Sequence, residues 1–168
     1  MPQLSLHSPV GDLTLSEEEG AIVSLDWGRV PAAVPGADLR QTPLLARAHL
    51  LLQNYFDGQH VDFTSVAMKP HGTTFQQRVW RALQAIPYGS VRTYGELALE
   101  LGSTPRALGG ACGANPIAIL IPCHRVVSSQ GLGGFSAEGG VATKVALLRL
   151  EGVMLSIFPS PPTKRTEK

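Results

Sequence analysis

The spacing of apolar residues changes near residue 70, and this change limits the possible folds most strongly. Before it, residues 4–28 form short runs of alternating apolar and polar residues separated by turn residues, a pattern that predicts antiparallel strands. The segment 42–58 has helical spacing and ends at Asp-Gly, and residues 61–68 predict one more strand. From Thr73 onward the spacing is helical. The chain is therefore expected to combine two differently built parts.

The second part predicts helices over residues 73–87, 93–102 and 105–114, the first two starting with capping-box patterns. The last two are separated by a tight turn that contains glycine, which is typical of a helix-turn-helix and equally of a plain helical hairpin. We expect an α+β protein. A small N-terminal α/β domain with antiparallel strands would span residues 1–70, and a mostly helical, winged-helix-like domain would span 71–155. Residues 156–168 would form a flexible tail.

Composition and charge limit the function classes. The chain has 168 residues, 43% of them hydrophobic and 16% charged, which is typical of a folded globular protein. No apolar run approaches the ~20 residues of a membrane span, and the N-terminus lacks a signal-peptide layout, so we expect a cytoplasmic protein. Residues 1–68 hold eight acidic side chains against three arginines, whereas residues 69–125 hold six basic against two acidic. The basic part could contact a polyanion, although proteins that bind no nucleic acid show such splits too.

The predicted helix over residues 105–114 is unusually rich in glycine and alanine. Each glycine in a helix costs up to ~1 kcal/mol relative to alanine, so this sequence is a poor choice for stability alone. Small side chains do allow another molecule to approach the backbone closely. The chain has no membrane segment in which another helix would pack here, so we expect this helix to contact a groove of a nucleic acid. Arg106 at the helix start could contact a phosphate or a base.

The hexapeptide IPCHRV, residues 121–126, is the strongest candidate for chemistry. A free cysteine is usually a small buried hydrophobe, but Cys123 directly precedes His124 and Arg125, which could support a thiolate. Pro122 disfavours a regular strand and predicts a bent backbone. A Cys-His pair is also compatible with a cysteine hydrolase. The only other cysteine is Cys112, too few for a disulfide framework or a four-ligand zinc site, so we expect no metal and no cofactor.

Five ordered segments resemble the O6-alkylguanine-DNA alkyltransferases: GTTFQQRVW, IPYGSVRTYGELA, RALGGACGANP, ANPIAIL and IPCHRV. The likeness runs in register from about Thr73 to Glu151, with a looser likeness in SPVGDLTL and QNYFDG. Two features depart from the family pattern. The twelve positions from Tyr94 to Arg106 are about two fewer than in several relatives. No cysteine precedes Cys112, so the zinc site that some relatives carry in the first domain cannot exist in that form.

The resemblance implies an enzyme of direct DNA repair that acts once. A monomer would transfer the alkyl group of O6-alkylguanine, and also of O4-alkylthymine, from double-stranded DNA to Cys123, after the nucleotide is flipped out. His124, acting through water, would be the base for the thiol, and Glu151 would orient that histidine. Tyr94 would donate a proton or hydrogen bond to the leaving base, and Asn115 would belong to the network beneath the site.

The resemblance also implies how DNA is held. Arg106 would fill the space left by the flipped nucleotide, and Tyr94 would lie against the phosphate backbone. The minor groove would receive the small residues of the same helix, Ala107, Gly109, Gly110 and Ala111. The substrate pocket would be formed by Ala118, Pro122, Phe135 and Ser136, with Ala118 replacing a proline of some relatives. Two alternatives stay open, a lesion binder that transfers nothing and a helix-turn-helix regulator.

Overall fold

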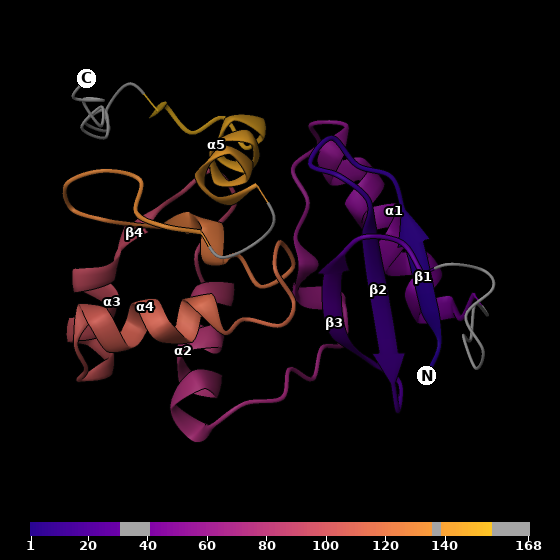
Figure 1. Cartoon of the computed structure of the whole chain (residues 1–168), viewed down its shortest axis with the longest axis horizontal. Coiled ribbons are helices and arrows are strands. Elements are labelled where there is room, and N and C mark those ends of the chain that lie inside the picture. Colours follow the sequence, from indigo (N-terminus) through magenta and orange to yellow (C-terminus); the bar gives the residue numbers. More distant parts are fainter. Residues whose placement is uncertain (31–40, 136–138, 156–168) are drawn as a thin grey trace, which may run out of the picture.

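The computed structural model of the chain describes residues 1–30, 41–135 and 139–155 (Figure 1). Ser136 and the predicted tail lie outside the described residues. The first half holds a three-stranded antiparallel sheet in the order β1-β2-β3, with one helix packed against it. Its elements are β1 (Gln3–Leu6), β2 (Leu13–Glu18), β3 (Ala21–Trp27), α1 (Pro43–Phe56) and the short 3-10 helix η1 (Phe63–Ser65).

The sheet and α1 form as the apolar spacing predicts. In the sheet, Leu15 of β2 faces Leu25 of β3, and both are buried. The helix α1 starts at Pro43, whose missing amide hydrogen suits a first helical position, and the Thr42 side chain accepts a hydrogen bond from the Leu45 amide. The predicted helix over 42–58 is therefore confirmed within a residue or two at each end.

The predicted strand over residues 61–68 is wrong. The Asp62 side chain accepts a hydrogen bond from the Thr64 amide at 2.9 Å, which closes a local turn and starts the 3-10 helix η1. Short polar side chains compete with strand pairing in this way. Only Met68 pairs with the sheet, through an isolated bridge to Ile22 of β3.

The second half is mostly helical. Helices α2, α3 and α4 pack on one another, and two very short strands, β4 and β5, pair in parallel. Between α3 and α4 the chain turns at Gly102, which has a left-handed φ of 65°, and the Thr104 side chain caps α4. The elements are α2 (Thr74–Gln84), β4 (Arg92–Thr93), α3 (Tyr94–Leu101), α4 (Pro105–Gly113), the 3-10 helix η2 (Cys123–Arg125), β5 (Val126–Val127) and α5 (Gly140–Leu150).

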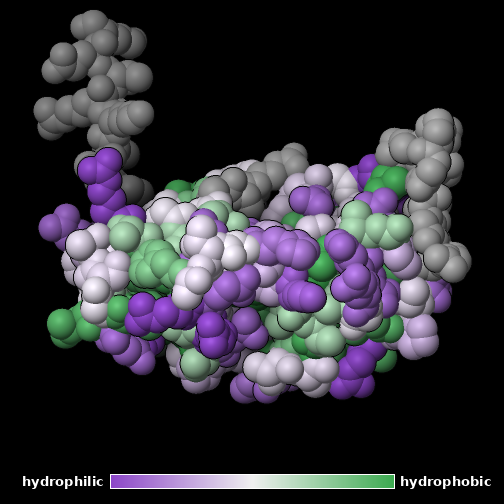
Figure 2. All heavy atoms as spheres, turned by 90° about the horizontal axis from the view of Figure 1, so that it is seen from below, coloured by the Kyte–Doolittle hydropathy of each residue, from purple (hydrophilic) through white to green (hydrophobic). Residues whose placement is uncertain are grey.

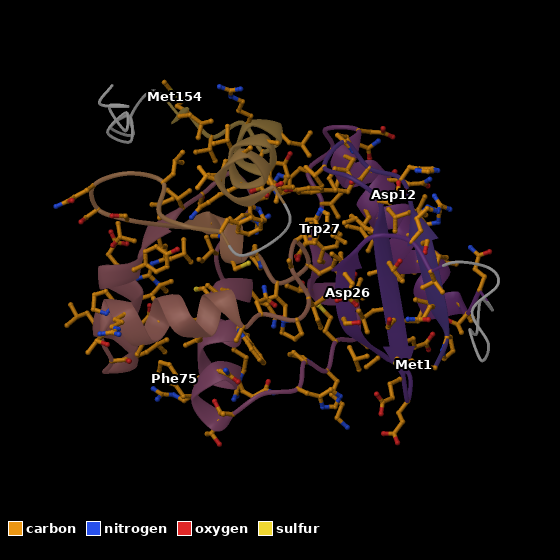
Figure 3. All side chains as sticks on the ribbon, viewed as in Figure 1. Met1, Asp12, Asp26, Trp27, Phe75 and Met154 are labelled. Atoms are coloured by element: carbon orange, nitrogen blue, oxygen red, sulfur yellow. The ribbon has the colours of Figure 1, made fainter. Side chains whose placement is uncertain are left out.

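The two halves share one hydrophobic core. The edge strand β3 hydrogen-bonds to the second half, from Leu25 N to Pro116 O at 2.9 Å, and pairs with Ile117 in an isolated bridge. Figure 3 shows side chains filling the space between the sheet and the helical half. The expected mixed α+β architecture is confirmed, with an antiparallel sheet first and the helical part after it.

The outer surface is of mixed polarity on the face drawn in Figure 2, where hydrophilic residues are interspersed with smaller hydrophobic areas. Among the described residues, no helix is both long and apolar enough to span a membrane.

Candidate active site

Two consecutive tight turns place Cys123. The first is centred on Ile119, where φ is 74°, and it closes with a hydrogen bond from Leu120 N to Ala118 O of 2.9 Å. A β-branched residue rarely adopts a positive φ, so this turn is strained. The second is centred on Pro122, with φ −82° and ψ 66°, and closes with a hydrogen bond from Cys123 N to Ile121 O of 2.8 Å. The bent backbone predicted from the proline is confirmed, and strain of this kind is common at functional sites.

Asn115 fastens this bent segment at both ends. Its side-chain Nδ2 donates to Ile121 O at 2.8 Å, and its Oδ1 accepts from Ile117 N at 3.0 Å. The Asn115 side chain also hydrogen-bonds to Cys123, which favours the thiolate form. One amide thus links the end of α4, the strained turn and the cysteine.

Behind Cys123 lies a buried polar cluster. His124 is fully buried, and its Nε2 lies 2.5 Å from Glu151 Oε2. Arg125 donates from Nε to Glu151 Oε1 at 2.8 Å and from Nη2 to Oε2 at 3.2 Å, and it also donates to Ile86 O at 2.8 Å. The other ring nitrogen, His124 Nδ1, is buried with no hydrogen-bond partner among the described residues.

The charges in this cluster follow from its contacts. Burial opposes a charge on Glu151, but hydrogen bonds and charges from His124 and Arg125 outweigh it and lower its pKa to about 2. Burial lowers the pKa of His124, against the pull of Glu151. Because Arg125 already balances the carboxylate, we assign a neutral His124 that donates from Nε2 to Glu151. Its Nδ1 then presents a lone pair that can accept a proton.

The Cys123 thiol is protonated at rest. Burial raises its pKa, and the hydrogen bond from Asn115 and the charge of Lys144 only partly oppose that effect. Burial also raises the pKa of the second thiol, Cys112, to about 12. Because a thiolate is the nucleophilic form, either cysteine needs a base before it can react. Cys123 has an imidazole next to it in the chain.

A cavity of about 490 Å³ lies in front of Cys123. It is lined by Tyr94, Pro105, Gly109, Cys112, Gly113, Cys123, Gly134 and Phe135. Of the four predicted pocket residues, Phe135 does line it and Ser136 is outside the described residues. Pro122 and Ala118 are not among the residues that line it, and their part in a substrate pocket stays a prediction. The turn at Pro122 directs that residue to a smaller cavity of about 260 Å³, and Ala118 is buried within the strained turn.

Tyr94 forms one wall of the cavity. Its ring packs against Gly133, where φ is 73° and a Cβ would lie only 2.9 Å from the ring. Lys144 Nζ lies 5.8 Å from the ring centroid, donates to Val126 O at 2.6 Å and to Gly134 O at 3.1 Å, and is fully buried. Burial raises the pKa of Tyr94 to about 12 and lowers that of Lys144 to about 8. The phenol of Tyr94 is therefore a hydrogen-bond donor at neutral pH.

The predicted DNA-binding residues of α4 divide between two faces. Arg106, Ala107 and Gly110 are exposed, and Gly109 is half-buried at the cavity. Ala111 is only 3% exposed and lies on the inner face, where its carbonyl accepts a hydrogen bond from Trp80. The prediction that Ala111 meets a groove is therefore corrected.

The sequence patterns missed three residues of the site. Arg125 was only a candidate neighbour of the cysteine, and it proves to be the main partner of Glu151. Lys144 stands three and four residues before the buried Leu147 and Leu148 of α5, so a cation on an apolar stripe was a usable signal. Tyr55 of α1, whose hydroxyl donates to Glu151 at 2.6 Å, has the spacing of an ordinary core residue.

Within the described parts of the chain, no group of three or more His, Cys, Asp or Glu side chains is placed to hold a metal ion. The expected metal independence stays a prediction.

Known proteins resemble both halves of the chain. A family model described as the ribonuclease-like domain of 6-O-methylguanine DNA methyltransferase matches residues 4–70. A second, described as the DNA binding domain of the same protein, matches residues 74–153. The Haemophilus influenzae protein named methylated-DNA–protein-cysteine methyltransferase is 40% identical over 151 residues, covering 87% of this chain and 83% of that protein. A Mycobacterium tuberculosis protein of the same name is 40% identical over 162 residues, covering 88% and 90%.

Solved structures agree with these matches. The M. tuberculosis OGT structure in complex with DNA superposes with a TM-score of 0.76 at 38% identity, covering 90% of this chain and 93% of that one. The M. tuberculosis O6-methylguanine methyltransferase gives a TM-score of 0.75 at 36% identity, with 96% of each chain covered. Since both family models match and these relatives extend over nearly the whole chain, the protein belongs to the O6-methylguanine-DNA methyltransferase family.

Proposed function

We propose that this protein repairs DNA directly, by moving the alkyl group of O6-alkylguanine in double-stranded DNA onto its own Cys123. The observation that supports this most is the place of Cys123, between a cavity of about 490 Å³ and the buried His124–Glu151 pair. Each molecule acts once, because a thioether offers no route back to the thiol. An alkyl group on O4 of thymine presents the same carbon–oxygen bond and is a second substrate.

The proton of the thiol leaves first. With the lesion in the cavity, it passes through a water molecule to His124 Nδ1, which holds a lone pair because Nε2–H is directed at Glu151. Glu151 stabilises the imidazolium that forms, as the third member of a nucleophile–base–orienter triad. A neutral resting thiol and a neutral resting imidazole avoid two uncompensated charges in a buried site.

The alkyl transfer is a displacement at carbon. The Cys123 sulfur attacks the alkyl carbon, a sulfur–carbon bond forms, and the bond from that carbon to O6 breaks with its electron pair staying on guanine. Tyr94 donates a proton or hydrogen bond to the departing base, since its raised pKa keeps the phenol protonated. The Tyr94 proton is restored from the imidazolium through solvent. The net products are an S-alkyl cysteine and unmodified guanine.

Access requires the nucleotide to leave the base stack. Extruding a base costs a few kcal/mol, least for a weakly paired one, which gives some selectivity for a lesion. The smooth face of α4 suits the minor groove, and Arg106 is exposed at its start with no hydrogen-bond or ion-pair partner among the described residues. We infer that Arg106 fills the vacated space. We also infer a monomer of two domains, divided near residue 70, that binds with strong salt dependence.

Intact-protein mass spectrometry tests the proposal. After incubation with a duplex that contains one O6-methylguanine, the protein should gain one methyl group, and peptide mapping should place it on Cys123. Cys123→Ser should still bind the duplex and gain nothing. The matched control is Cys112→Ser, which should accept the methyl group as the wild type does. Methyl on Cys112, several turnovers per molecule, or no gain in mass would overturn the proposal, and the last result would favour a lesion binder or a regulator.

A further inference from the structure

Glu151 is held by groups from several separate parts of the chain. Its Oε1 accepts hydrogen bonds from the Gly89 amide at 3.1 Å and from Arg125 Nε. Its Oε2 accepts from Arg125 Nη2, from His124 Nε2 at 2.5 Å and from the Tyr55 hydroxyl at 2.6 Å. A carboxylate has about four lone-pair positions, so the described contacts saturate it. Among these donors, only Tyr55 comes from the N-terminal half.

Packing against neighbouring aromatic rings holds the Tyr55 side chain in place, independently of its hydrogen bond to Glu151. It is fully buried on the inner face of α1, and its ring centroid lies 5.3 Å from Phe56, 5.6 Å from Phe63 and 6.1 Å from Tyr88. The Tyr88 and Phe56 contacts are edge-to-face, a favoured arrangement of aromatic rings. The ring therefore cannot swing away, and the hydroxyl points at one oxygen of Glu151, 96 residues away in the sequence.

We propose that Tyr55 is a positioning residue for the alkyl transfer: its hydroxyl orients Glu151 and thereby sets the basicity and the orientation of His124. The N-terminal half then belongs to the active site, although it supplies no group that touches substrate. This inference rests on the proposed function, in which His124 is the base for Cys123.

The hydroxyl acts through the oxygen that it shares with His124. A hydrogen bond from Tyr55 neutralises part of the negative charge on Oε2, so Oε2 attracts the proton on His124 less strongly. Without it, Oε2 becomes the stronger acceptor and the His124 pKa moves up relative to wild type. The Glu151 carboxylate also loses its hydrogen bond from α1. Because Oε2 is then held less firmly, the orientation of the His124 imidazole bonded to it is less well fixed. The raised pKa slows the removal of the thiol proton only where the pH is near or below it, because more of the imidazole is then already protonated. The loosened imidazole slows proton removal at every pH.

Other charged or titratable groups face the same pair and stay in place in the test. They are Arg125 of η2, which binds Glu151, Lys144 of α5, whose charge lowers the pKa of His124, and Tyr88, whose pKa is raised by burial and by Glu151. Tyr88 is the matched control. Its hydroxyl donates to Leu150 O at 3.2 Å and makes no hydrogen bond to Glu151, yet its ring packs against the same aromatic cluster.

The experiment compares wild type, Tyr55→Phe and Tyr88→Phe with free O6-benzylguanine, which needs no flipping. The rate of Cys123 labelling is measured from pH 5 to 9, and the His124 imidazole is titrated by NMR. We expect Cys123 of Tyr55→Phe to be labelled about tenfold more slowly, the lower end of the loss found when a group that orients a metal-bound histidine is removed. The acid limb of its pH–rate profile and its imidazole titration should both move to higher pH. Tyr88→Phe should match wild type in all three.

Two results are decisive in the other direction. If Tyr55→Phe has the wild-type pH profile and imidazole titration, whatever its rate or thermal stability, the hydroxyl is only part of the core and the positioning role is wrong. The same conclusion follows if Tyr88→Phe shifts both readouts equally. If wild type is not labelled on Cys123 at all, the proposed function fails instead, and the wild-type arm reveals this before any variant is compared.

Discussion

The two sides of Cys123 are built in opposite ways. The cavity in front is lined by small or apolar residues, among them Gly109, Gly113 and Gly134. The cluster behind is dense and polar: Glu151 is surrounded by hydrogen-bond donors, and its partners His124 and Arg125 are both buried. The difference shows where each side obtains its partners. Apart from His124 Nδ1, the rear cluster finds its hydrogen-bond partners within the protein and is preorganised, whereas the front leaves space for a substrate that supplies its own polar groups.

The rear cluster is where removal of one group should do the most damage. Glu151→Gln keeps the shape but leaves Arg125 buried without its counter-charge, and losing one partner of a buried ion pair typically costs about 3–5 kcal/mol. We expect an unfolding free energy lower by that amount in urea titrations, with labelling slowed severely. The matched control is Glu100→Gln, which removes an exposed pair with Arg92 and should change stability by less than about 1 kcal/mol. If Glu151→Gln and Glu100→Gln lowered the unfolding free energy equally, the rear cluster would be no more sensitive than an exposed ion pair, which would contradict this expectation.

Acid should weaken the same cluster. The Glu151 pKa is about 2 in the folded protein against 4.5 in the reference state, so the unfolded chain binds the extra proton between these values. A depressed carboxylate pKa gives stability that is present above pH 4.5 and is lost as pH falls toward 2. The loss attributable to this group is about 3 kcal/mol. Urea titrations at several pH values should show this decline in wild type, and Glu151→Gln should lack it. Parallel declines in both proteins would assign the acid sensitivity elsewhere.

On the front side, substitutions of Arg106 and of Tyr94 should differ in which substrates react more slowly. If Arg106 fills the gap left by a flipped nucleotide, Arg106→Ala should slow repair of methylated duplex by one to two powers of ten, roughly 1.4–3 kcal/mol, and leave labelling by free benzylguanine unchanged. Tyr94→Phe should slow both, because the leaving base loses its donor in either case. Pseudo-first-order labelling of each variant with both substrates measures this. If Arg106→Ala slows the free base as much as the duplex, the arginine supports the fold or the cavity.

The two sides also differ in how far the sequence predicts them. Cys123 and His124 are chain neighbours, and Asn115 acts on residues within eight positions, so local patterns reach them. Tyr55 is different, because helical spacing describes it fully as a core residue and its polar partner is brought to it only by packing of the two halves. Ala111 was a wrong inference that spacing could have avoided, since positions 108, 111 and 112 share the inner face of α4.

The smallest effect expected concerns Gly110, which is exposed on α4 and has open space where a Cβ would stand. Gly110→Ala should therefore raise the unfolding free energy by about 0.5–1 kcal/mol through helix propensity alone. If this face meets a groove, the added methyl should weaken duplex binding a few-fold, and Gly110→Leu should weaken it more while keeping most of the gain in stability.

Labelling by free benzylguanine should not change, because the Gly110 position does not line the cavity. Urea titration, duplex titration and labelling measure the three quantities. Unchanged duplex binding by Gly110→Leu would mean that the smooth face of α4 is not the DNA-binding face.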